Sequence, residues 1–516
     1  MNFAERISPM SVVEERANAW LKEELEANNR VVRSSNAPGG REIAHLVRLG
    51  VLFPVTQGHY ALKRAEDAEA TVAPLLYWSA VRAVLDDRYD WSLRGPSALA
   101  ALVADSAIPE RLSVRTAQAS NQVLRLFGGY PVLLRKDTAF DTRLVKPIEI
   151  AGEQLNVDAP ELVLVELSGQ PDDPKYRAFV AGTEFDSATL AAIYRRRPSP
   201  TAYRRAAAIA RDVRRADLAA VLDRIVGKAT VYAPAHLLMT PLAPTPTLTP
   251  PWEELQTAQL CEFADHLTQV LGERADALPR TDLGVLKRRA QSARRYDVYH
   301  STSIEGYRVT PEDVSVLLAG SAARFSGDPE EIRNRMAVLG YARAFDLTLE
   351  RAVAQKGNAA PAQRVVRETY AALFSPSVDA GIVDPLDLVD YRRGQVFIRD
   401  TPHTPPPHSK VPGLMRALHD SLAQIDNLLV QSILWHYGLV TIHPYLDGNG
   451  RTARLVMNYR LLTAGLPWVT IRTEDRADYF DALAAGQVGG DPEPFGRFVL
   501  RHVEAAAEAI ADKRST

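Results

Sequence analysis

Residues 441–458 read TIHPYLDGNGRTARLVMN, with a histidine, a carboxylate, two glycines and two arginines close together. Glycines and closely spaced charges both work against stable packing, so a purely structural element rarely has this composition. The same residue types are needed to seat a polyphosphate, hold a metal ion and move a proton. This stretch therefore determines how the second half of the chain is interpreted.

The LDGNG turn needs residues that tolerate a left-handed backbone, and Gly448, Asn449 and Gly450 meet that need. The RTARLVMNYRLL pattern after it predicts a helix, so the turn lies at a helix N-terminus. Such a terminus has a partial positive charge and free N–H donors, which suit anionic phosphates. Arg451 and Arg454 are spaced i, i+3, so one helix face would present both guanidinium groups to phosphate oxygens.

Two further side chains complete the predicted chemistry. Asp447 offers a hard oxygen to Mg²⁺, which prefers one or two carboxylates together with substrate phosphates. His443 has a reference pKa of about 6.5, so its neutral form can remove a proton from an incoming hydroxyl. Together they predict nucleotidyl or phosphoryl transfer from a Mg²⁺-bound nucleotide. The structural alternative, a helix–turn–helix corner with a capping aspartate and surface arginines, is disfavoured by this conjunction of residue types.

The string HPYLDGNGRTAR resembles the Fic motif, HxFx(D/E)GNGRxxR, with Tyr445 in place of phenylalanine. The resemblance extends over roughly residues 255–503 and implies an all-helical domain with one β-hairpin flap. It also implies a protein adenylyltransferase that carries out AMPylation, moving AMP from Mg²⁺-ATP to a Ser, Thr or Tyr hydroxyl of a protein target or of the chain itself. GNGR is intact, which favours AMP transfer over phosphate transfer, because phosphate-transferring relatives have a degraded GNGR segment.

The resemblance implies a role for each matching position. His443 is the expected base and Asp447 the expected Mg²⁺ ligand. The expected nucleotide-binding residues are Gly448, Asn449, Gly450, Arg451 and Arg454, together with Tyr479 near the adenine pocket.

The segment GQVFIRDTPHTPPP resembles the Fic target-binding flap. A β-hairpin is expected around residues 395–400, with Val396, Phe397 and Ile398 as target-binding residues. Main-chain groups of such a hairpin can pair with an extended target segment. His403 is interpreted as a flap-stabilising or surface histidine.

A second motif lies in VYHSTSIEGYRVT, residues 298–310, where Ser301, Glu305 and Gly306 match the Fic inhibitory motif (S/T)xxxE(G/N). An inhibitory helix is expected over residues 284–305. The resemblance implies that Glu305 pairs with Arg454 and occupies the γ-phosphate space, which makes the chain autoinhibited. The structural alternative is a surface glutamate at a helix C-terminus before glycine. In some relatives the same glutamate also promotes AMP removal.

The first part of the chain predicts a winged-helix-like module over residues 1–75. Ser11 and Glu14 form the pattern of a capping box at a helix start, and a short helix is expected over residues 41–49. Two strands, residues 51–55 and 59–62, are expected to form a hairpin around Gln57-Gly58.

Residues 76–235 predict an α+β domain that ends in a basic helical stretch, residues 194–228. Phosphate contact and a plain solvated helix face are both open for that stretch. The strings GVLFPVTQGHYAL, LRGPSALAAL and PERLSVRT, within residues 30–169, resemble the abortive-infection (AbiEi-like) antitoxin family. That resemblance implies a winged helix able to bind operator DNA.

The whole chain of 516 residues is too long for one core and predicts a multidomain, mainly α protein. Five prolines between residues 241 and 251 predict a linker over residues 236–255, followed by the Fic-like domain over residues 256–516. Cys261 is the one cysteine, which excludes an internal disulfide, and the net charge of −2 argues against wholesale polyanion binding. No signal-peptide or membrane-spanning pattern appears, so we expect a cytoplasmic protein without a membrane partner.

An interpretation from a different class remains open. In it the chain is a DNA-binding transcriptional regulator or a toxin–antitoxin-like switch, and its second half only senses the nucleotide. ATP and a protein target are the expected partners of the enzyme, and DNA is the expected partner of the regulator. The oligomeric state is left open by the sequence.

Overall fold

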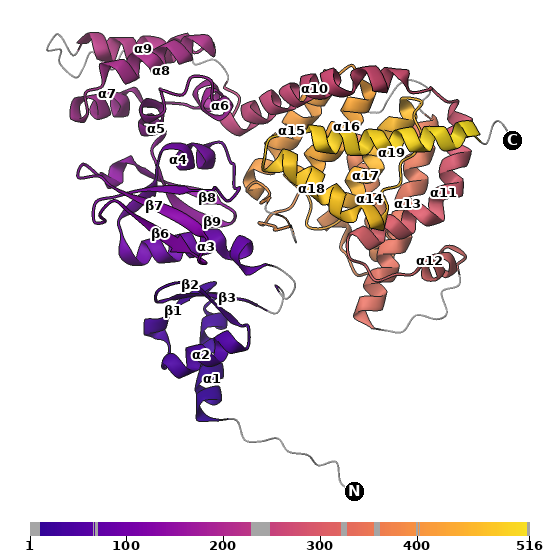
Figure 1. Ribbon diagram of the computed structural model, residues 1–516, viewed down its shortest axis with the longest axis horizontal. Helices are drawn as coiled ribbons and strands as arrows, with labels where there is room; N and C mark the ends of the chain where they lie inside the picture. Colours follow the sequence, from indigo (N-terminus) through magenta and orange to yellow (C-terminus); the bar gives the residue numbers. More distant parts are fainter. Residues whose placement is uncertain are drawn as a thin grey trace, which may run out of the picture. The chain divides into compact units, whose positions relative to one another are not determined.

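The computed structural model describes residues 11–64, 67, 71–228, 248–320, 328–354, 362–398, 401 and 403–512. The chain divides into two compact units (Figure 1). One comprises Met1–Pro251 with Phe397–Pro407, and the other comprises Trp252–Val396 with His408–Thr516. Much of the predicted linker, residues 236–247, lies outside the described residues, and its end is helical because α10 (Pro251–Ala277) begins at Pro251.

The first unit opens with two helices and a small antiparallel sheet. α1 (Val12–Glu26) is capped by Ser11, and the reciprocal bonds between Ser11 and Glu14 confirm the predicted capping box. The other elements are β1 (Val31–Arg33), α2 (Gly40–Arg48), β2 (Leu52–Thr56) and β3 (His59–Leu62), with strand order β1-β3-β2. Gly58 has φ +83° in the β2–β3 turn, so the predicted hairpin is confirmed.

A six-stranded mixed sheet follows, with strand order β6-β7-β5-β4-β9-β8. The pairs β5–β7 and β4–β9 are parallel and the other neighbours are antiparallel. This sheet and its helices confirm the α+β prediction (Figure 1). Its elements are α3 (Val72–Arg88), β4 (Trp91–Leu93), α4 (Gly95–Leu102), β5 (Leu112–Thr116), β6 (Gln122–Leu126), β7 (Tyr130–Lys136), β8 (Val145–Ile150) and β9 (Glu153–Asp158).

Five helices then complete the first unit: α5 (Pro160–Glu166), α6 (Pro174–Gly182), α7 (Ser187–Arg196), α8 (Pro200–Asp212) and α9 (Ala216–Lys228). The basic stretch is therefore divided among three helices, because Pro200 starts α8 and Arg214 takes a left-handed φ of +64° before α9. Arg215 is 5% exposed and donates to three backbone carbonyls at the C-terminal end of α6, those of Val180, Ala181 and Thr183. At least this arginine is structural and not part of a basic surface.

The second unit is helical throughout its described residues. Besides α10 it contains α11 (Leu283–Ile304), α12 (Pro311–Leu318), α13 (Pro329–Ala354), α14 (Ala362–Asp379), α15 (Val411–Leu422), α16 (Leu428–Ile442), α17 (Asn449–Thr463), α18 (Arg476–Gln487) and α19 (Glu493–Asp512). α16 and α17 pack together in its centre and are buried on nearly every side, as expected of interior helices.

Short 3₁₀ helices lie in both units, at Ser34–Asn36, Thr142–Leu144, Pro385–Leu388, His408–Lys410 and Thr473–Asp475.

The predicted β-hairpin flap does not appear as paired strands in the part of the segment that the structure describes. Residues 395–398 form no strand, and neither do residues 403–407. Pro405, Pro406 and Pro407 lack an N–H, so this arm cannot donate ladder hydrogen bonds. Phe397 is 41% exposed.

In the described residues no helix combines the length and the apolar character needed to cross a membrane.

Candidate active site at the start of α17

The loop between α16 and α17 begins with a strained residue. His443 caps α16 with φ +53° and ψ +61°, a left-handed conformation that is uncommon for residues other than glycine. Arg392 fixes this conformation from outside: its Nε donates to the His443 carbonyl at 2.8 Å and its backbone N–H to the Pro444 carbonyl at 2.9 Å. The His443 Nδ1 lies 3.3 Å from the Val440 carbonyl, so with a proton on Nδ1 the basic nitrogen is Nε2.

The middle of the loop is held by Tyr445 and Asn449. The Tyr445 ring is 4% exposed and stacks on Tyr370, with ring centroids 3.6 Å apart. The Asn449 side chain donates to the Tyr445 carbonyl at 2.8 Å and accepts its N–H at 2.9 Å. Asn449 was predicted to present its backbone N–H to a phosphate, and its side chain closes the loop. Only its backbone N–H, at the first turn of α17, remains for a phosphate.

The two glycines are required by close approaches. Gly448 has φ +80°, and a Cβ there would lie 2.8 Å from the Leu373 side chain. At Gly450 a Cβ would lie 2.3 Å from Oε1 of Glu305. The Glu305 carboxylate therefore rests directly against the first turn of α17, where the helix N-terminus favours an anion.

Arg454 forms hydrogen bonds with two of the predicted inhibitory residues, Ser301, which is buried, and Glu305, whose side chain is 28% exposed. Arg454 is 3% exposed; its Nε donates to Ser301 Oγ at 2.8 Å, and its Nη2 donates to Oε1 of Glu305 at 2.8 Å. Burial alone would lower the pKa of Arg454, but the neighbouring Glu305 carboxylate raises it overall. Its Nη1 is buried without a hydrogen-bond partner among the described residues. Gly306 follows with φ +86° and ends the turn.

Asp447 and Arg451 form a second group with a residue that the sequence analysis missed. Asp447 Oδ2 accepts from Arg451 Nη2 at 2.9 Å and from the Tyr307 hydroxyl at 3.0 Å, and Oδ1 accepts the Gly448 N–H at 2.6 Å. Burial would raise the pKa of Asp447, but Arg451 lowers it overall, so the side chain is a carboxylate. An ionised carboxylate that is 54% exposed fits a hard divalent cation. Tyr307 directly follows the inhibitory motif, and that adjacency was the available signal.

Tyr479 is buried close to Arg454, whose charge acts on the Tyr479 hydroxyl. Its ring is 1% exposed and lies among Phe495 and Phe498, and its hydroxyl is 3.0 Å from Nε2 of His436. Burial raises the pKa of Tyr479 to about 12. The predicted contact between Tyr479 and the adenine stays a prediction. Val396 and Ile398 of the predicted flap are half-buried.

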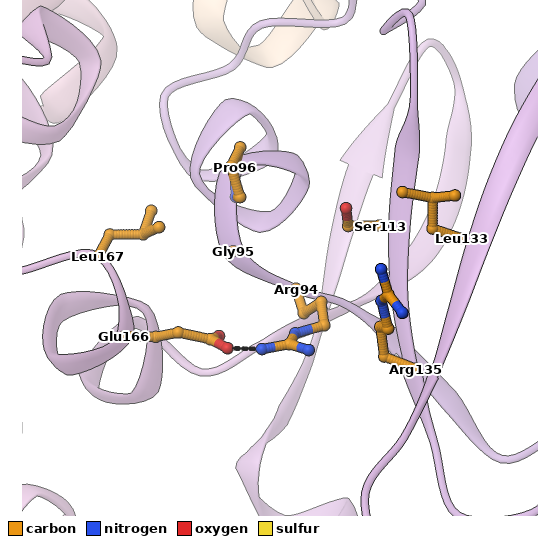
Figure 2. A pocket seen from close by; sticks show the side chains of 8 residues that line it. All are labelled: Arg94, Gly95, Pro96, Ser113, Leu133, Arg135, Glu166 and Leu167. Carbon is orange, nitrogen blue, oxygen red and sulfur yellow. Dashed lines mark ion pairs between the residues drawn. The ribbon is translucent and has the colours of Figure 1, made fainter. Parts of the chain in front are cut away.

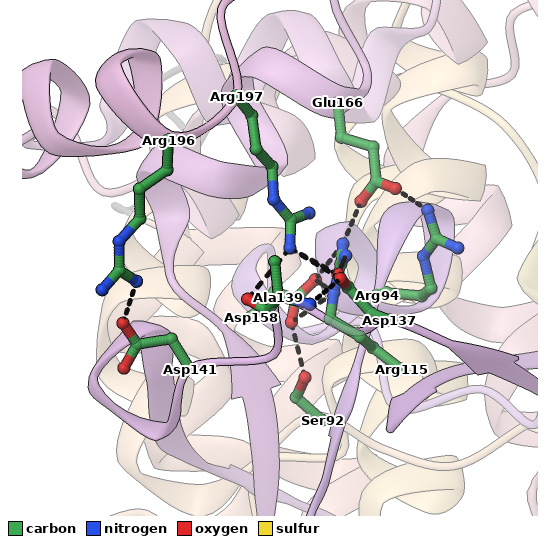
Figure 3. Close-up of polar contacts among 10 residues, drawn as sticks. All are labelled: Ser92, Arg94, Arg115, Asp137, Ala139, Asp141, Asp158, Glu166, Arg196 and Arg197. Carbon is green, nitrogen blue, oxygen red and sulfur yellow. Dashed lines mark hydrogen bonds and ion pairs between the residues drawn. The ribbon is translucent and has the colours of Figure 1, made fainter. Parts of the chain in front are cut away.

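The first unit contains another polar cluster, centred on Arg115 (Figure 3). Arg115 Nη2 lies 2.9 Å from both Asp158 and Glu166, and its Nη1 pairs with Asp137. Arg197 donates to both oxygens of Asp137, at 2.7 and 2.8 Å. Every carboxylate of this group is paired with an arginine, which is the pattern of a structural network.

A cavity of about 260 Å³ lies beside this network, with Arg94 and Arg135 in its lining (Figure 2). The Arg94 guanidinium is paired with Glu166, which Arg115 also holds. Because Arg94 is neutralised by this pair, the residues at the start of α17 remain the stronger candidate for chemistry.

Comparisons with known proteins agree with this geometry. Residues 364–461, which include the loop and most of α17, match the family described as Fic/DOC. A protein adenylyltransferase Fic from Nematostella vectensis is 34% identical over 245 residues, covering 46% of this chain and 54% of that protein. Its counterpart from Aedes aegypti is 31% identical over 251 residues, covering 47% and 48%. The chain thus spans about half the length of these curated relatives.

A solved structure of Fic-1 from C. elegans is 21% identical, with a TM-score of 0.38. It covers 69% of this chain and 93% of that chain.

Proposed function

Since residues 364–461 of this chain match the Fic/DOC family, we propose that the protein transfers AMP from Mg²⁺-ATP to a hydroxyl of a protein target. We also propose that Glu305 holds it in an inhibited resting state. The observation that carries both proposals is the placement of His443, Asp447 and the Glu305–Arg454 pair around one helix N-terminus. That arrangement combines a base, a cation ligand and an anion seat.

The chain's own residues would act as follows. The N–H groups at the start of α17 and the Arg454 guanidinium seat the phosphates. His443 Nε2 takes the proton of the target hydroxyl, whose oxygen then bonds to the α-phosphorus. The bond between the α-phosphorus and the α,β-bridging oxygen breaks, and pyrophosphate leaves with the electron pair. Asp447 would hold Mg²⁺, which when bound would offset part of the phosphate charge.

The resting position of Glu305 opposes this sequence of events. Its carboxylate lies against Gly450 and is bonded to Arg454 at 2.8 Å. A phosphate at the same place would meet a like charge at close range and would lose the Arg454 contact. Productive nucleotide binding therefore requires that Glu305 moves away from α17.

The role of His443 is tested in the Glu305→Gly background, where transfer is expected to be measurable. With Mg²⁺ and ATP labelled at the α-phosphate, the single variant should incorporate label, and the Glu305→Gly/His443→Ala variant should not. Both should bind ATP. ATP labelled at the γ-phosphate should label neither. Label retained without His443, or label arriving from the γ-phosphate, would contradict the proposed reaction.

A second function is favoured by one observation in the first unit. Arg41 and Arg48 are exposed on α2, with His45 half-buried between them, so one face of this helix is basic. We propose that this face contacts DNA phosphates, with the β2–β3 hairpin beside it. Duplex DNA binding should weaken with salt and with the Arg41→Ala/Arg48→Ala double variant, and it should survive His443→Ala. Binding unaffected by the double variant would exclude this face.

A further inference from the structure

Tyr307 holds the predicted metal ligand in a closed triangle of hydrogen bonds. Its hydroxyl donates to Asp447 Oδ2 at 3.0 Å and accepts from Arg451 Nη2 at 3.0 Å. Arg451 Nη2 also donates to Asp447 Oδ2 at 2.9 Å. Each of the three side chains therefore contacts the other two.

The triangle uses both lone pairs of one carboxylate oxygen of Asp447, Oδ2. A carboxylate oxygen accepts about two hydrogen bonds, and Oδ2 of Asp447 already has two donors, Tyr307 and Arg451. Oδ1 accepts the Gly448 N–H at 2.6 Å. A divalent cation must displace one of these donors before Asp447 can coordinate it through Oδ2.

The Tyr307 ring is fixed independently of its hydroxyl. The side chain is 8% exposed, and the guanidinium carbons of Arg451 and Arg333 lie 4.8 and 5.2 Å from the ring centroid. These cation–π contacts do not depend on the hydroxyl. Replacing Tyr307 with phenylalanine should therefore keep the ring in place and remove only the hydrogen bonds of its hydroxyl, including the one to Asp447.

The Tyr307–Asp447 hydrogen bond is connected along the chain to Glu305. Glu305 caps α11, Gly306 turns the chain with φ +86°, and the Tyr307 N–H returns to the Thr302 carbonyl at 3.4 Å. One turn thus carries two side chains that reach two sites on α17: Glu305 reaches Arg454, and Tyr307 reaches Asp447 and Arg451. A movement of this turn would release both.

We propose that Tyr307 is a positioning residue that restrains metal binding at Asp447, as a second lock beside Glu305. The inference rests on the proposed function, because it takes Asp447 to be the metal ligand. It follows that removing the Glu305 carboxylate frees only Arg454. Full activation then requires the loss of both contacts.

The test measures metal binding and not turnover. The full-length chain is titrated with Mn²⁺ in the presence of an ATP analogue with a non-cleavable α,β bridge, and free Mn²⁺ is followed by electron paramagnetic resonance. Tyr307→Phe should tighten Mn²⁺ binding about fivefold relative to the unchanged protein. Tyr296→Phe on α11, the helix that ends just before Tyr307, removes the hydroxyl of a tyrosine that is 46% exposed; it is the matched control and should leave Mn²⁺ affinity unchanged.

An Asp447→Asn variant separates the two possible failures. If it weakens Mn²⁺ binding while Tyr307→Phe leaves affinity unchanged or lowers it, the Tyr307 lock is overturned and the metal site stands. If Asp447→Asn has no effect, the metal ligand itself is misassigned, and the proposed function fails together with the lock. The inference is supported if Tyr307→Phe binds Mn²⁺ more tightly than the unchanged protein and Asp447→Asn binds it more weakly.

Discussion

Arg454 Nη2 donates to Glu305 Oε1 across 2.8 Å, although the two residues are 149 positions apart in the chain. The bond joins the C-terminal end of α11 to the second turn of α17. Charge-assisted hydrogen bonds to buried guanidinium groups are among the stronger single interactions in proteins. The pair is therefore well suited to hold the site closed, and it can be perturbed from either helix.

Gly450 offers a way to perturb this pair sterically. A Cβ there would lie 2.3 Å from Oε1 of Glu305, so Gly450→Ala must displace the carboxylate. We expect the substitution to destabilise the unchanged chain by about 1–3 kcal/mol. In the Glu305→Gly background the nearest remaining atom is Nη1 of Arg454, at 3.2 Å, at the end of a flexible side chain. The cost of Gly450→Ala should therefore be smaller there, because alanine also has the higher helix propensity. Urea unfolding of the four members of this double-mutant cycle checks the expectation, and equal costs in both backgrounds would contradict it.

Tyr445 stands where the Fic motif has phenylalanine. Variants of Tyr445 therefore test whether the ring or the hydroxyl stabilises the loop between α16 and α17. The ring is 4% exposed and stacked on Tyr370. Tyr445→Phe should change the unfolding free energy by less than about 1.5 kcal/mol, and Tyr445→Ala should cost about 3–5 kcal/mol. A large loss of stability in Tyr445→Phe would show that the hydroxyl is required for the loop.

The contiguous Fic motif explains how much of this site the sequence predicted. The identities and order of residues 443–454 place a base, a carboxylate and two arginines at a helix N-terminus, and the structure has them there. The long-range pairing of Glu305 with Arg454 was also predicted, because each residue lies in its own recognisable motif.

Other features depend on tertiary contacts that no local pattern encodes. Tyr307 is outside both motifs, so its bond to Asp447 appears only when α11 and α17 meet. Tyr479 lies on α18, and the sequence of that helix does not show which of its faces is buried. The structure places Tyr479 in the core. The composition of the basic stretch could not show that Arg215 would cap carbonyls near α6.

The arginine network of the first unit makes a stability prediction independent of the site at the start of α17. Arg115→Met would leave the Asp158 carboxylate, 1% exposed, without its cation and should cost about 3–5 kcal/mol. Arg143, whose side chain is 76% exposed, pairs with Asp141. Arg143→Met is the matched control and should have no measurable effect. Hydrogen–deuterium exchange of β5 and β9 reports the difference, and equal protection in both variants would contradict the assigned role.

The pKa of Asp137 predicts how this network responds to acid. Burial would raise the pKa, but hydrogen bonds from Arg197, the Ala139 N–H and Arg115 lower it from 3.8 to about 2. A depressed pKa stabilises the fold above the unfolded-state value and loses that contribution as the pH falls through the folded-state value. The contribution is about 2 kcal/mol and should vanish between pH 4 and pH 2.

Asp137→Asn measures that contribution directly. Its destabilisation, followed by exchange of β7 amides against the unchanged chain at the same pH, should be large at pH 5 and small near pH 2. A difference that stays constant over this range would mean that Asp137 does not titrate with the stated shift.

The central proposal for this protein is an AMP-transferring site that Glu305 keeps closed. The most direct measurement is intact-protein mass spectrometry of the unchanged chain and of Glu305→Gly after incubation with Mg²⁺ and ATP. We expect self-modification by the mass of AMP in Glu305→Gly, at a level about tenfold or more above the unchanged chain. Equal modification of the two proteins would contradict the inhibitory role of Glu305, and an added mass other than that of AMP would contradict the proposed reaction.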